Sequence, residues 1–168
     1  MNSSEIIELI KFVGGFAIVY ISARLAINKF YREKWWEKRV DYYLKVIDSV
    51  YVIQEADLYR LRDQYTDRCG QDSDPNFSKL SKVDELELNE RADKARGELK
   101  RLAHIAPLVL SDKASYLIFN YLNESEKIYP QWYHDEIDTD EAYNKTHQLS
   151  QKLLSDILQD SKNILKVK

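Results

Sequence analysis

The sequence has few of the residues that break helices or build compact catalytic loops. Its 168 residues include one cysteine, three prolines and four glycines. The single Cys69 excludes an internal disulfide and is typical of a reducing compartment. Four scattered glycines cannot form a phosphate-binding loop. The scarcity of glycine and proline favours an all-α chain.

Residues that would carry catalysis or bind metal are equally sparse. The three histidines, His104, His134 and His147, stand in no metal-binding or catalytic spacing. Carboxylates gather after His134, but acidic side chains at a helix start are explained by the helix dipole. The Glu-x-x-His pairs of di-iron bundles do not occur. We therefore expect a protein without enzymatic activity, bound metal or cofactor.

The net charge of −3 hides an asymmetry along the chain. Residues 24–39 hold six basic and two acidic side chains, whereas residues 40–168 hold 18 basic and 24 acidic ones. Nucleic-acid binding needs a basic surface. The acidic body therefore predicts no nucleic-acid partner.

Large apolar residues gather near the N-terminus. Twelve residues without charge, 12–23, would cover only about 18 Å as a helix, whereas a bilayer core is about 30 Å thick. If Lys11 and Arg24 extend their charges to the head groups, the apolar span grows to residues 6–27. This stretch predicts an N-terminal transmembrane helix.

The residues around and after this span are typical of a membrane–water interface. Aromatic rings prefer that interface, and basic residues stay on the cytoplasmic side. We expect a single-pass protein of the cell membrane, with the bilayer as a partner and the C-terminal part in the cytoplasm. The predicted membrane-interface residues are Arg24, Lys29, Tyr31, Arg32, Lys34, Trp35, Trp36, Lys38 and Arg39.

Three other interpretations of the N-terminal segment were weighed. A cleaved signal peptide needs basic residues before the apolar run, and here the charge order is reversed. A helix buried in a globular core, and a helix lying in the membrane interface, both stay open.

We expect two parts, residues 1–28 as terminal segment and anchor and residues 29–168 as a cytosolic helical bundle.

Residues 29–68 lack glycine and proline, and apolar residues recur at alternating steps of four and three, as in coiled-coil packing. This stripe is Trp36, Val40, Tyr43, Ile47, Val50, Leu58, Leu61 and Tyr65, broken near Gln54.

Three more helices are predicted, giving an antiparallel bundle of about four. The first follows a cap at Ser81 and runs to Ala106, with Pro107 ending or kinking it. Its many charges of both signs indicate a solvated face. The second covers residues 112–129, is stopped by Pro130, and should be the most buried because it is apolar nearly all round. The last begins at Thr139 as N-cap and runs to about Val167.

Twelve tyrosines give the chain many candidate contact points. The predicted partner-binding residues are Tyr43, Tyr51, Tyr59, Trp132 and Tyr133. Packing at the rim of the core is the alternative for the tyrosines of the long helix. Tyrosine and tryptophan also anchor protein interfaces.

Together these features predict a non-enzymatic, single-pass membrane protein. Its cytosolic bundle would mediate protein–protein interaction or form a homo-oligomer. The alternative is a small membrane-acting effector, toxin-like or defensive, that oligomerises and permeabilises the bilayer. Arg24 motivates it, because a charge within a membrane segment is often functional.

Overall fold

The computed structural model describes the backbone of residues 3–165 and the side chains of residues 20–165. Within that range all regular structure is helical, in four α-helices and one short 3-10 helix. The expectation of an all-α fold is confirmed for this part of the chain. The elements are α1 (Ser3–Cys69), η1 (Gln71–Ser73), α2 (Lys82–Val109), α3 (Asp112–Tyr133) and α4 (Thr139–Leu165).

The chain divides into two compact units, residues 1–39 and residues 40–168. The division lies within α1, some way beyond the predicted boundary at residue 28. The physical reason is where core packing begins. Side chains from residue 20 to Arg39 are exposed, and Tyr43 is the first fully buried one.

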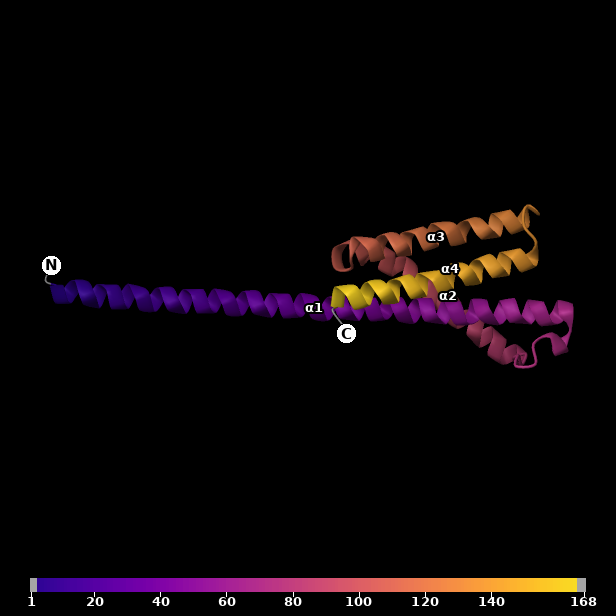
Figure 1. Cartoon of the computed structure of the whole chain (residues 1–168), viewed down its shortest axis with the longest axis horizontal. Helices are drawn as coiled ribbons and strands as arrows, with labels where there is room; N and C mark the ends of the chain where they lie inside the picture. Colours follow the sequence, from indigo (N-terminus) through magenta and orange to yellow (C-terminus); the bar gives the residue numbers. More distant parts are fainter. Residues whose placement is uncertain (1–2, 166–168) are drawn as a thin grey trace. The chain divides into compact units, whose positions relative to one another are not determined.

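The second unit is a helical bundle with one main apolar core. In Figure 1, α3 and α4 run side by side in opposite directions, and they are in direct contact. All four helices contribute to the core, and burying one such aliphatic side chain stabilises the fold by about 1.5–3 kcal/mol. The core residues are Tyr43, Val46, Val50, Ile53, Leu99, Leu102, Ala106, Leu110, Ala114, Ile118, Tyr121, Leu153 and Ile157.

The buried line on α1 differs in part from the predicted stripe. Tyr43 and Val50 are buried as expected, but Trp36 and Tyr65 are exposed. Val46 and Ile53 complete the buried line instead. The core-facing side of α1 therefore combines residues of the predicted stripe with apolar residues that lie beside it, Val46 and Ile53.

Neither helix ends at its proline, although a proline removes one helical N–H and its ring crowds the carbonyl four residues before it. The alternative of a kink at Pro107 stays a prediction. Helix α2 continues past Pro107 to Val109, and α3 continues past Pro130 to Tyr133. The ends still form helical bonds: the Leu110 N–H donates to Ala106 at 2.8 Å.

The helix starts follow the expected capping chemistry with one correction. The Ser81 side chain accepts from the Asp84 N–H, as predicted. For α4, the side chain of Asp138 rather than Thr139 accepts, from the Glu141 N–H at 2.7 Å. Thr139 instead accepts a hydrogen bond from Trp132.

Helix α3 is not the most buried helix, contrary to expectation. Only Ala114, Ile118, Tyr121 and Ile128 are buried along it. The physical reason is that apolar residues lie on all sides of α3, whereas only one side of the helix packs against the rest of the bundle. Its exposed aromatic side chains are Tyr116, Phe119, Tyr129, Trp132 and Tyr133.

Among the residues whose side chains are described, no helix has a stretch long and apolar enough to cross a membrane. Most of the predicted span, residues 6–27, falls on residues 1–19, whose side chains lie outside the described residues. The transmembrane helix therefore stays a prediction.

Candidate functional site

The predicted membrane-interface residues all lie on α1 within residues 1–39, with exposed side chains. Trp35 and Trp36 are each 54% exposed. Lysines lie close to the aromatic rings: Lys34 is 6.0 Å from the ring of Phe30, and Lys38 is 5.9 Å from that of Trp35. This segment therefore presents rings and ammonium groups together, the mixture that suits a lipid head-group layer.

The predicted partner-binding tyrosines of α1 fall in three different environments. Tyr43 is fully buried and donates to Asp160 at 2.7 Å, so it belongs to the core and not to an exposed surface. Tyr59 is half-buried, and its hydroxyl accepts from the Leu80 N–H at 3.4 Å. Tyr51 is exposed. The helical spacing of eight residues does not keep the three on one face of the bundle.

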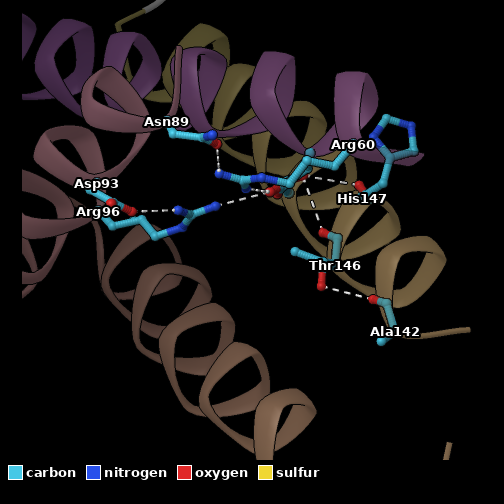
Figure 2. A network of polar contacts seen from close by, with 9 residues as sticks. Arg60, Asn89, Asp93, Arg96, Ala142, Thr146 and His147 are labelled. Atoms are coloured by element: carbon cyan, nitrogen blue, oxygen red, sulfur yellow. Dashed lines mark hydrogen bonds and ion pairs between the residues drawn. The ribbon is translucent and has the colours of Figure 1, made fainter. Parts of the chain in front are cut away.

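Figure 2 shows a polar network in which Arg60 and Arg96 contact Asn89 and Asp93. Both arginines also bind Asp57, a buried carboxylate of α1. Arg96 donates to its Oδ1 at 3.0 Å and Arg60 at 3.3 Å. The two arginines are held in turn by α2, Arg96 by Asp93 at 3.0 Å and Arg60 by Asn89. The network thus joins α1 to α2 through charge-assisted hydrogen bonds.

The second oxygen of Asp57, Oδ2, has no hydrogen-bond partner among the described residues. The nearby Ser150 hydroxyl donates to the carbonyls of Thr146 and His147. Burial raises the pKa of Asp57 above its ordinary value, although Arg96, Ser150 and Arg60 act in the opposite direction. The network therefore holds a carboxyl group whose charged form is disfavoured by burial.

Beside this network an open cavity of about 480 Å³ lies between α2, α3 and α4. Its residues lie at steps of three and four along each helix, so each helix turns one face toward it. Helix α2 contributes Arg96 and Lys100, α3 contributes Tyr121, Tyr129 and Trp132 among others, and α4 contributes Ala142, Tyr143 and Thr146. Arg96 and Thr146 belong to both the cavity and the network of Figure 2.

The cavity has an apolar body and a charged side. Tyr121 is buried, and burial raises the pKa of its hydroxyl well above the usual value. Trp132 forms part of the wall and is fixed by the bond from its Nε1 to Thr139 at 3.1 Å. Lys100 and Glu126 form an exposed ion pair of 2.8 Å at the rim. Its lining combines four aromatic, three aliphatic and six polar or charged side chains, and its volume falls in the range of ligand sites.

The predicted contact pair Trp132 and Tyr133 lies at one end of α3. Trp132 lines the cavity, whereas Tyr133 does not. Tyr133 is stacked on Tyr129, with ring centres 6.2 Å apart, and both are mostly exposed. Trp132 is therefore part of the cavity wall, whereas Tyr133 lies on the outer surface.

Sequence reasoning missed the network and the cavity. Arg96 was assigned to a solvated face, but it is half-buried and turned toward Asp57. One signal was present: Asp57 follows Ile53 by four residues, so it continues the buried line of α1. A carboxylate at such a position requires a cation from a neighbouring helix.

Within residues 20–165 no group of three or more histidine, cysteine or carboxylate side chains could hold a metal ion. Comparisons of the chain with protein-family models, with curated proteins and with solved structures find no match.

Proposed function

We propose that the chain is a non-enzymatic, single-pass membrane protein whose cytoplasmic bundle binds another protein or a second copy of itself. The observation that carries this proposal is the number of large apolar side chains left exposed on two segments, residues 20–36 of α1 and the outer face of α3. Contiguous apolar surface of this kind marks contact with lipid or with another protein.

Residues 20–36 supply the support for anchoring. Tyr20, Ile21, Leu25 and Ile27 are all more than half exposed, and the aromatic and basic residues follow directly. In a bilayer these side chains would contact acyl chains, and the basic residues would contact anionic head groups at about 1 kcal/mol each.

Fractionation of cells expressing the full chain tests anchoring. We expect the full chain to stay with membranes after alkaline carbonate washing and a variant without residues 1–39 to appear in the aqueous fraction. The control is Tyr116→Ala/Phe119→Ala, which removes exposed aromatic surface from the bundle and should leave membrane binding unchanged.

Three further observations test the same proposal. A full chain found in the aqueous fraction without detergent would contradict the anchor. Protease added to intact cells should leave the bundle uncut, because the proposal places it in the cytoplasm. Growth arrest and dye release caused by the full chain but not by the shortened one would favour the membrane-acting effector.

Helix α3 supplies the support for partner binding. Tyr116 and Phe119 are 67% and 62% exposed and lie one helical turn apart. Exposed tyrosine and phenylalanine at this spacing form a compact apolar patch of the kind that anchors protein interfaces.

Photo-crosslinking tests this patch in the full chain. We expect a benzophenone amino acid at Phe119 to give a discrete crosslinked band, whose mass identifies a second copy or another protein. The matched control places the same amino acid at Gln151, an exposed polar position on α4. Equal crosslinking at the two positions would contradict a specific interface on α3.

A further inference from the structure

The cavity between α2, α3 and α4 has no part in the proposed membrane or protein contacts. It is lined by three helices of the same unit, and Arg96 and Thr146 belong both to its lining and to the network around Asp57. A site enclosed by three helices of one bundle is a common place for a small ligand.

The charges that line the cavity favour an anion. Arg96 and Lys100 are cationic, one turn apart on α2, and Glu126 is the lining carboxylate. Lys100 and Glu126 are both more than half exposed at the rim, whereas the Arg96 side chain is 31% exposed. The most deeply placed charge in the cavity is therefore positive.

Arg96 also retains donor capacity. A guanidinium has five N–H donors. One terminal nitrogen of Arg96 pairs with Asp57 and the other with Asp93, each at 3.0 Å. Its planar group is thus held in place by two carboxylates while further N–H groups are available. A fixed guanidinium loses less entropy on binding a carboxylate than a mobile one does.

The remaining wall suits a flat apolar body. Tyr129, Trp132 and Tyr143 line the cavity from α3 and α4. The Tyr129 and Trp132 ring centres lie 5.9 Å apart with planes tilted by 53°. Tyr133 stacks on one face of Tyr129, with ring centres 6.2 Å apart. Tyr121, a buried residue of α3, also lines the cavity.

We propose that this cavity binds a small monoanionic ligand, a carboxylate with an aromatic or otherwise flat apolar body, whose charge is recognised by Arg96. The aromatic wall contacts the apolar body, and the Tyr121 hydroxyl is positioned to donate to the ligand's oxygen. This site is separate from the proposed function and stands or falls without it.

Calorimetric titration with three probes of equal shape tests the proposal. The probes are biphenyl-4-carboxylate, the neutral biphenyl-4-carboxamide and the cationic 4-phenylbenzylamine. They are added to the full chain in buffer if it purifies without lipid, and otherwise in phosphatidylcholine nanodiscs. We expect the carboxylate to bind about tenfold more tightly than the carboxamide, since charge-assisted bonds are the stronger ones, and the amine to bind most weakly.

The matched blank is Ala142→Phe in the same medium. The added ring occupies the cavity, so it should abolish binding of all probes, while partition into lipid stays the same. Far-ultraviolet circular dichroism confirms that this variant remains folded.

A second variant isolates the role of the charge. Asp57→Asn/Arg96→Gln removes both members of the buried ion pair, so neither leaves the other unpaired. Arg60 keeps its hydrogen bond to Asn89, and Asp93, which also loses Arg96, is exposed to solvent. We expect the carboxylate to lose its tenfold preference, while the carboxamide binds within about twofold of the original chain. The proposal would be overturned if biphenyl-4-carboxylate gave no more binding heat with the original chain than with Ala142→Phe. Equal affinities of the carboxylate and the carboxamide for the original chain would also overturn it.

Discussion

At the scale of single residues, the bundle depends on charges placed where apolar side chains would be expected. Asp57 and Asp160 are both almost completely buried. Asp160 accepts from Tyr43 at 2.7 Å and from Ser111 at 2.6 Å, and Ser111 also caps α3 through the Ala114 N–H. Each carboxylate thus joins helices through directional bonds, which select one arrangement of the bundle.

The titration of Asp57 predicts how stability depends on pH. Burial raises its pKa in the folded chain, so its protonated form stabilises the fold. That contribution is fully present below the unfolded pKa of about 3.9 and is lost as pH rises through the folded pKa. We expect the unfolding free energy of the original chain, relative to Asp57→Asn, to increase as pH falls from about 7 to about 4.

Urea denaturation of both chains at several pH values measures this difference. Glu126→Gln, at an exposed rim position, serves as the control and should show no comparable trend. A difference between the original chain and Asp57→Asn that is independent of pH would contradict the raised pKa.

The Tyr43 hydroxyl can be tested by a substitution that removes a single oxygen. Tyr43→Phe deletes the bond to the buried Asp160, which keeps only Ser111 as a side-chain partner. We expect a loss of about 2 kcal/mol in the free energy of unfolding, measured by chemical denaturation. The same change at exposed Tyr51 should stay within about 0.5 kcal/mol. Equal effects at both positions would show that the buried bond contributes nothing.

At the scale of elements, the two described glycines differ in backbone conformation, although a Cβ at either would meet nothing within 4 Å. Gly97 lies inside α2, and a Cβ there would meet nothing within 4 Å. Gly70, just after α1, has φ of +90°, a conformation that other residues rarely adopt. Only the glycine at the end of α1 is therefore required by the backbone.

This contrast predicts opposite effects of one substitution. Gly97→Ala should raise the free energy of unfolding by about 1 kcal/mol, because alanine is the better helix former. Gly70→Ala should lower it by about 1 kcal/mol or more, because alanine is strained at positive φ. Thermal melts of both variants measure the shifts, and a common sign would contradict this account.

The helices of the bundle also show which of their features the sequence could predict. The three helices after α1 were predicted within a few residues, because apolar period, caps and helix breakers are local signals. Which side chains of these helices are buried was not predicted correctly, as the exposed aromatic residues of α3 show. An apolar side chain on a helix becomes core only where another helix covers it, and that depends on neighbours distant in sequence.

At the scale of the whole molecule, the core residues that the structure describes all lie within residues 40–168. We expect this fragment to fold without residues 1–39, with a free energy of unfolding within about 1 kcal/mol of that of the full chain. Circular dichroism and urea denaturation check this. A fragment of residues 60–168 is the control: it lacks Tyr43, Val46, Val50 and Ile53 and should lose cooperative unfolding.

The sequence by itself determined the helical class, the helices of the bundle and the grouping of basic and aromatic residues in one segment. These follow from composition and from periodicities within one helix, where interacting residues are three or four positions apart. Only the tertiary structure decided that Asp57 pairs with Arg96, 39 positions away, and Tyr43 with Asp160, 117 positions away. It also decided that a cavity opens beside Arg96, because such contacts depend on which helix faces meet, and local periodicity carries no information about that.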